Sequence, residues 1–140
     1  MADAAARLVL DGGAEAATIS GITAAVGVSP RTFHNYFSSV ADALLYFTAD
    51  VLESFAADIP SVCPGKSVTA VLEAALLESL EDEEKELRSL HTLYRIGEAL
   101  DNLSHTSEER RRFERVSDTI ISAFQQRGTD YTDYELGVVL

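Results

Sequence analysis

Hydrophobic residues recur at helical spacing along most of the chain, with polar residues in the positions between them. Four apolar stripes of this kind occur within residues 44–55, 68–80, 87–100 and 113–124. The third stripe comprises Leu87, Leu90, Tyr94, Gly97 and Leu100. Each such helix needs a partner for its apolar face, so the pattern predicts an all-α fold whose later helices pack as a bundle.

Capping residues divide the first part of the chain into short helices. We expect three of them, at residues 2–10, 18–26 and 30–37. Thr18 can cap the second helix, and Gly27 suits the left-handed residue at its end. Ser29 and Pro30 begin the third helix cleanly, because proline at the first helical position loses only an amide that has no partner. Two short helices joined by a glycine turn are typical of a helix-turn-helix.

The third predicted helix carries polar side chains that can reach base edges or phosphates. They are Arg31, Thr32, His34 and Asn35. Four such side chains on a helix of about two turns suit insertion into a DNA major groove. The same residues could instead be ordinary surface positions of a small helical domain.

A longer helix is expected next, because Ser39 and Asp42 have the spacing of a capping box. We predict a connecting helix at about residues 40–58, followed by a linker at about 59–66 that contains two prolines and a glycine. The chain then divides into residues 1–45, the helix-turn-helix domain, and residues 46–140, a helical domain. A further capping box, formed by Thr132 and Glu135, predicts a helix close to the last residue.

The net charge of −12 argues against a nucleic-acid function, because DNA-binding proteins usually have a basic face. The distribution of charge weakens this objection, since residues 16–41 contain no acidic residue and include Arg31. The acidic run at residues 81–86 is interpreted as a solvated helix terminus or corner rather than a metal site. Four arginines between residues 110 and 115 follow two glutamates, which favours a solvated, paired helix face.

The sequence gives little support for catalysis or an extracellular location. A single cysteine, Cys63, excludes an intrachain disulfide framework and suits the cytoplasm. No signal peptide or membrane span is predicted. The histidines, His34, His91 and His105, have no metal-ligand spacing, and Gly65 to Ser67 lacks the rest of a phosphate-binding loop. We therefore expect no enzyme, metal or cofactor.

The string GVSPRTFHNYF, with Thr18 and Ile22 before it and Asp42, Leu44 and Leu45 after it, resembles the DNA-binding domain of TetR family transcriptional regulators. The resemblance covers about the first third of the chain. This sequence has His34 where the family usually has tyrosine and Val40 where it usually has a lysine that contacts the DNA backbone. The loss of that lysine predicts weaker phosphate binding.

What the resemblance implies is a regulator, usually a repressor, that binds a palindromic operator as a homodimer and responds to a small-molecule effector. The DNA-binding residues it implies are Thr18, Ser29, Arg31, Thr32, His34, Asn35 and Tyr36. The second domain would bind the effector and form the dimer. Its candidate pocket residues are His91, Tyr94 and Phe124, although residues of these types are more often ordinary core residues.

Two other functions stay open from the sequence. One is a helical protein-interaction module that has kept this fold but lost strong DNA binding, as Val40 and the overall acidity suggest. The other is a helical enzyme, which is supported only by scattered histidines and carboxylates. Salt dependence separates DNA binding from the first alternative, because phosphate-driven binding weakens steeply with salt.

Overall fold

The computed structural model describes residues 1–62 and 87–103 and six single positions between residues 106 and 122, and within these residues it contains helices and no strand. The first helices are α1 (Ala2–Gly12), the short 3-10 helix η1 (Ala14–Ala16), α2 (Ile19–Val26) and α3 (Pro30–Tyr36). The other two described helices are α4 (Val40–Val62) and α7 (Leu90–Asn102). The all-α prediction is confirmed, whereas η1 was not predicted.

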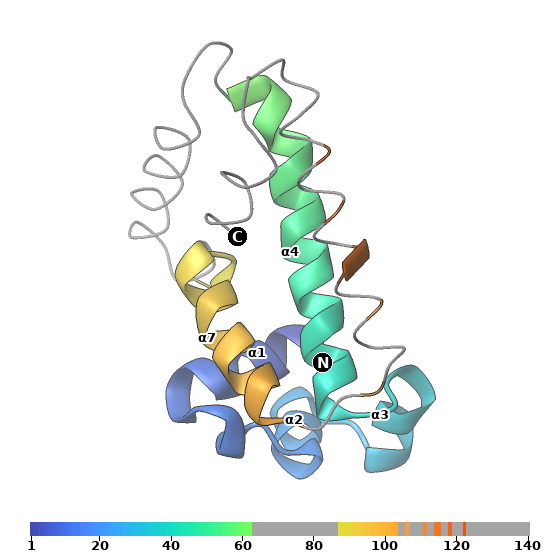
Figure 1. The fold of residues 1–140 in the computed structure, drawn as a ribbon. Coiled ribbons are helices and arrows are strands. Elements are labelled where there is room, and N and C mark those ends of the chain that lie inside the picture. Colours follow the sequence, from blue (N-terminus) through green and yellow to red (C-terminus); the bar gives the residue numbers. More distant parts are fainter. Residues whose placement is uncertain are drawn as a thin grey trace.

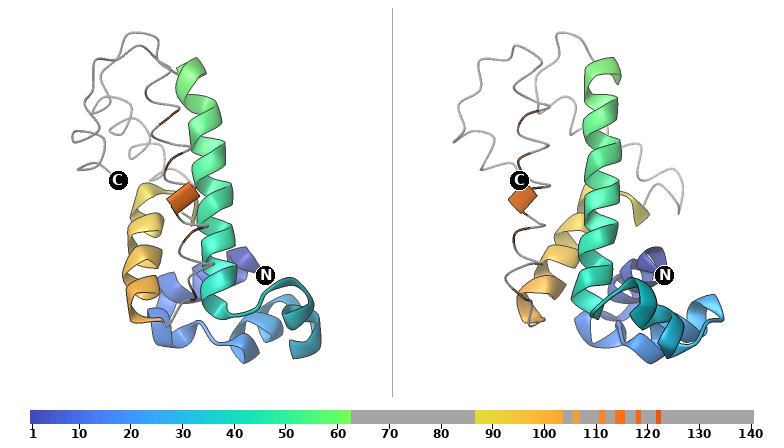
Figure 2. Two further views of the ribbon diagram at one scale, coloured as in Figure 1. Left: turned by 45° about the vertical axis from the view of Figure 1, so that its right-hand side comes forward. Right: turned by 90° about the vertical axis from the view of Figure 1, so that its right-hand side faces the viewer.

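The first three α-helices gather at one end of the long helix α4 (Figure 1). Further views show α4 extending away from them, with α7 beside its first turns (Figure 2). Helix α7 contacts α1, η1 and α4, although it follows them by many residues. The N-terminal helices and the later helix α7 therefore form one packed unit.

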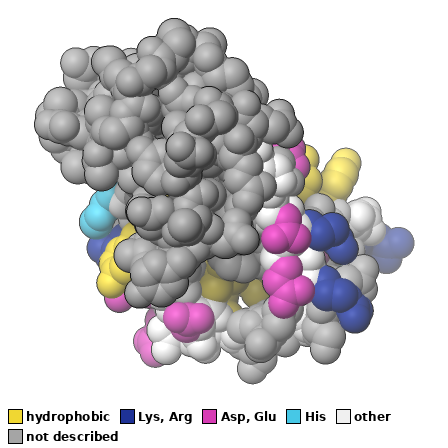
Figure 3. All heavy atoms as spheres, turned by 45° about the horizontal axis from the view of Figure 1, so that its top comes forward, with side chains coloured by type: hydrophobic (Ala, Val, Ile, Leu, Met, Phe, Trp, Pro, Cys, Tyr) yellow, Lys and Arg dark blue, Asp and Glu magenta, His cyan; other side chains and the backbone are white. Residues whose placement is uncertain are grey.

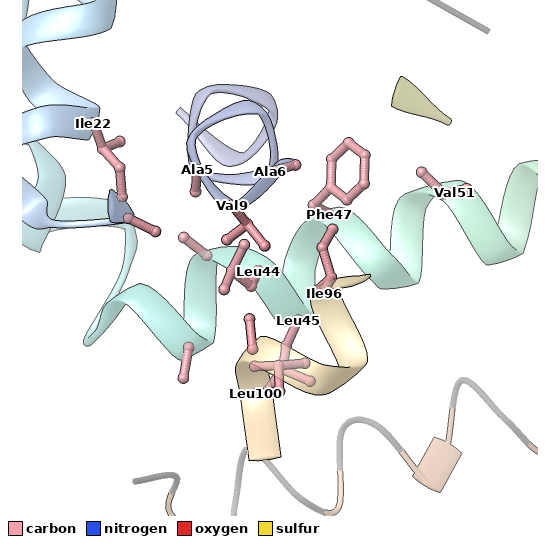
Figure 4. Close-up of a cluster of buried hydrophobic side chains, with 14 of the residues drawn as sticks. Ala5, Ala6, Val9, Ile22, Leu44, Leu45, Phe47, Val51, Ile96 and Leu100 are labelled. Carbon is pink, nitrogen blue, oxygen red and sulfur yellow. The ribbon is translucent and has the colours of Figure 1, made fainter. Parts of the chain in front are cut away.

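A single hydrophobic core joins these elements. Val9 of α1, Leu44 and Phe47 of α4 and Ile96 of α7 are buried within it (Figure 4). Ile22 of α2 belongs to the same cluster, whose members are each less than one-tenth exposed. The core therefore includes residues from both sides of the predicted domain boundary at residue 45.

Helix α4 is longer than predicted. It ends at Val62, whereas the sequence predicted a connecting helix that ends near residue 58 and a linker from residue 59. The helix thus includes Pro60, which a helix can accommodate at the loss of one backbone hydrogen bond and at a cost of about 3 kcal/mol. The rest of the predicted linker and Cys63 lie outside the described residues.

Ser39 and Asp42 form a cap at the start of α4. The backbone N–H of Asp42 donates to Ser39 Oγ at 2.9 Å, as a capping box requires. The Asp42 carboxylate accepts from the backbone N–H of Ser38 at 2.9 Å and from the Ser38 hydroxyl at 3.3 Å. The carboxylate therefore also binds the residue that precedes the capping serine.

The buried face of α7 differs from the predicted stripe. Leu87 and Leu100 are buried as predicted, but the Tyr94 side chain is 64% exposed, so its assignment to the apolar face was wrong. Thr92 and Ile96 are fully buried instead. A buried threonine is tolerated because its N–H donates to Ser89 Oγ at 3.2 Å and its hydroxyl lies 3.3 Å from the same oxygen.

Several sequence predictions fall on residues outside the described part of the chain. These are the stripe at 68–80, the apolar residues of the stripe at 113–124, and the cap at Thr132 and Glu135. None of the described helices has the length and hydropathy needed to cross a membrane.

Candidate nucleic-acid interface

Helix α2 begins and ends as the sequence predicted. Thr18 Oγ1 accepts a hydrogen bond from the Gly21 N–H at 3.0 Å, which caps the helix. Gly27 at the other end is left-handed, with φ 69° and ψ 33°. Its N–H donates to the Ala24 carbonyl, and the Val28 N–H donates to the Thr23 carbonyl at 3.0 Å. These two bonds form a Schellman motif, which turns the chain sharply toward α3.

Gly21 lets α2 lie close to the first helix. A Cβ atom at this position would lie 3.1 Å from Thr18 Oγ1 and 3.4 Å from Leu8 Cδ1. The first of these distances is tighter than ordinary van der Waals contact. The glycine therefore costs about 1 kcal/mol of helix propensity but permits the close approach of the capping threonine and of α1.

Helix α3 is capped by Ser29. Its hydroxyl oxygen accepts from the Thr32 N–H at 3.1 Å and lies 2.9 Å from Thr32 Oγ1. Both hydroxyls already take part in the cap. A hydroxyl has one donor and two acceptor sites, and one of these two hydroxyls donates to the other, so only the accepting hydroxyl keeps its proton for a phosphate oxygen.

The two faces of α3 differ in polarity. Phe33 is completely buried and attaches the helix to the core. Arg31, His34 and Asn35 are exposed, and Tyr36 is 70% exposed. The predicted base-reading side chains therefore lie on a solvent-facing surface of a helix whose other face is anchored. Thr32 is half-buried beside its capping serine.

Aromatic rings continue from α3 to α4. The Phe33 ring lies 5.5 Å from the Phe37 ring, measured between centroids, and 5.7 Å from the His34 imidazole in an edge-on arrangement. Phe37 in turn meets the ring of Tyr46 of α4 at 5.8 Å. The sequence does not indicate the contact of Tyr46, because no spacing rule relates a residue of the second turn of α4 to the end of α3.

The charge around α3 is weakly positive. Arg31 is the lone lysine or arginine between residues 16 and 41, and no acidic residue occurs there. Elsewhere the described surface is mixed: in the view of Figure 3, basic side chains at one edge lie beside acidic ones. One such pairing joins Arg88 to Asp50 at 2.8 Å and to Asp3 at 3.9 Å. Residues 16–41, the acid-free segment, are thus distinct from their surroundings in charge.

Of the three predicted effector-pocket residues, the structure describes His91 and Tyr94. His91 and Tyr94 are both exposed, and the Tyr94 hydroxyl donates to Glu98 Oε1 at 3.3 Å. Phe124 lies outside the described residues, so the pocket stays a prediction. Among the described residues, no group of three or more histidine, cysteine or carboxylate side chains could hold a metal ion.

Comparison with known proteins supports the interpretation of these helices. Residues 2–45 match the family model of bacterial regulatory proteins of the tetR family, a range that includes α1, α2, α3 and the first turns of α4. No curated protein and no solved structure matches the chain significantly. The matched family consists of DNA-binding transcriptional regulators rather than enzymes. Residues 2–45 therefore carry the N-terminal helix-turn-helix domain of tetR family regulators.

Proposed function

We propose that the protein is a transcriptional repressor that places α3 in the major groove of its operator. Arg31, Thr32, His34 and Asn35 would contact base edges, while Thr18, Ser29 and Tyr36 would contact the backbone. The observation that carries this proposal is the outward face of α3, where Arg31, His34 and Asn35 are exposed while Phe33 is fully buried. A rigidly anchored helix with exposed polar side chains is what groove insertion requires.

We expect the protein to make few charged contacts with DNA phosphates. Arg31 is the lone permanent cation of the acid-free segment, and Val40 supplies none at the start of α4. Each neutralised phosphate releases counterions and steepens the dependence of binding on salt. With few phosphate contacts, we expect weak binding whose affinity falls only gradually as salt rises.

The short length of the recognition helix α3 favours a homodimer that binds a palindromic operator. Helix α3 has seven residues and can contact only a few base pairs. Two copies with their recognition helices one helical turn of DNA apart would double the contact, and the operator would share the two-fold symmetry of the protein. We assign the protein to the cytoplasm, where it would have access to a bacterial chromosome.

Release by a small-molecule effector is supported by the position of α7. This helix lies beyond the matched family region, yet it packs on α1, η1 and α4. The Arg88 side chain at its start also binds Asp50 of α4 and approaches Asp3 of α1. An effector that binds better to one arrangement of α7 would therefore shift the orientation of the helix-turn-helix.

Fluorescence anisotropy with duplex DNA tiled across the region upstream of the gene tests the proposal. We expect one tile to bind preferentially, with an affinity that falls as salt increases. If a well-folded protein prefers no tile at low salt, operator binding is excluded for that region. The protein-interaction module would then be the better account of an acidic chain that carries valine at position 40.

A further inference from the structure

Tyr46 lies outside the predicted DNA-contacting set, but its ring touches the end of the recognition helix. The side chain is 48% exposed, and its ring meets Phe37 at 5.8 Å with an interplanar angle of 68°. Such edge-on contacts between aromatic rings stabilise a structure beyond the apolar area that they bury. Tyr46 is thus a contact from α4 to the residue that ends α3.

Phe37 holds the last turn of α3 in place. It is the C-cap residue, and its N–H donates to the Phe33 carbonyl at 2.9 Å. The turn that this bond closes carries His34, Asn35 and Tyr36, all of which are exposed. A helix of seven residues has little intrinsic stability, so its last turn depends on side chains that pack against it.

We propose that Tyr46 is a positioning residue for DNA recognition: by packing on Phe37, it fixes the last turn of α3 and with it the reading positions of His34 and Asn35. The inference rests on the proposed function of α3. Tyr46 need not contact DNA in this account, because it acts through the Phe37 ring and the backbone bond from Phe37 to Phe33.

The test compares Tyr46→Ala with Tyr46→Phe, using the duplex that the wild-type protein selects from a randomised library. Tyr46→Ala should weaken binding to this duplex by about two- to twelvefold, the equivalent of one aromatic pair. Tyr46→Phe keeps the ring and should bind within about twofold of wild type. Asn102→Ala is the control, because Asn102 is an exposed, uncharged residue at the end of α7, and it should leave affinity unchanged.

Two further readouts separate positioning from a general loss of stability. Binding to a non-selected duplex should change less than binding to the selected one, because phosphate contacts tolerate small shifts of the last turn. In an Asn35→Ala background, Tyr46→Ala should also weaken DNA binding less than it does in the wild-type background. The reason is that the Asn35 contact with DNA, which Tyr46 positions, is already absent. Equal losses on both duplexes, or full additivity with Asn35→Ala, would overturn the proposal.

Amide hydrogen exchange keeps the proposal testable even if the protein selects no duplex. Tyr46→Ala should speed exchange of the Phe37 N–H while leaving the α7 amide of Leu93 unchanged, since Leu93 donates to Ser89 in a different helix. Unchanged exchange at Phe37 would refute the positioning role. Failure of the wild-type protein to bind any DNA would instead refute the proposed function, and the two failures are therefore distinguishable.

Discussion

The guanidinium of Arg88 lies 2.8 Å from the carboxylate of Asp50 and joins the start of α7 to α4 across 38 residues of sequence. The same guanidinium approaches Asp3 of α1 at 3.9 Å. These side chains are about half exposed, so water and salt screen their attraction. The bridge therefore specifies how α7 docks more than it strengthens the fold.

Removal of this bridge should have a small and salt-dependent effect on stability. Arg88→Ala is expected to lower the free energy of unfolding by less than about 1 kcal/mol, as for other exposed ion pairs. A double-mutant cycle with Asp50→Ala, measured by urea denaturation at low and high salt, isolates the pair. A coupling energy that stays the same at both salt concentrations would contradict this assignment.

Two glycines should respond to alanine with opposite signs. Gly27 has φ 69°, where a Cβ atom is strained, so Gly27→Ala should destabilise the protein by about 1 kcal/mol. Gly97 lies inside α7, and a Cβ atom there would meet nothing within 4 Å. Gly97→Ala should therefore stabilise by about 0.5–1 kcal/mol. Thermal denaturation of both variants checks the pair, and a stabilising change at Gly27 would rule out the left-handed turn.

Substitution of Ser29 should separate helix capping from DNA binding. Ser29→Ala removes the acceptor of the Thr32 N–H and should cost about 1 kcal/mol of stability. Ser29→Asp restores an acceptor and should keep near-native stability, but its charge would repel phosphates and weaken DNA binding. Denaturation and anisotropy on the same variants give both quantities. Wild-type affinity in Ser29→Asp would show that position 29 lies away from the DNA.

Sequence reasoning predicted the helix-turn-helix well, because local chemistry determines it. Thr18 and Ser29 cap the helices that follow them, and Gly27 adopts the left-handed conformation that ends α2. Each of these features depends on hydrogen bonds within five residues. The burial of Phe33 was also predictable, because it lies opposite the polar side chains of its helix.

Features that depend on tertiary packing were not predictable from the sequence. Tyr94 shares the spacing of the leucines around it, but the structure buries Thr92, whose polar groups are satisfied by Ser89. The contacts of Arg88 with Asp50 and of Tyr46 with Phe37 join separate helices, so no local pattern could indicate them. The 3-10 helix η1 is three residues long and lacks a distinctive sequence signal.

The central claim is that the exposed face of α3 binds DNA, and one comparison tests it most directly. The anisotropy of the preferred duplex is titrated with wild type, Arg31→Ala and Arg111→Ala across a range of salt concentrations. Arg111→Ala is the control, because it makes the same change in net charge as Arg31→Ala. Arg111 is also exposed, but it lies outside the matched region. Arg31→Ala should lose about 1–3 kcal/mol of binding free energy, and its salt slope should fall by about 1 if Arg31 contacts a phosphate. Equal affinities for the Arg31→Ala and wild-type proteins would contradict the claim.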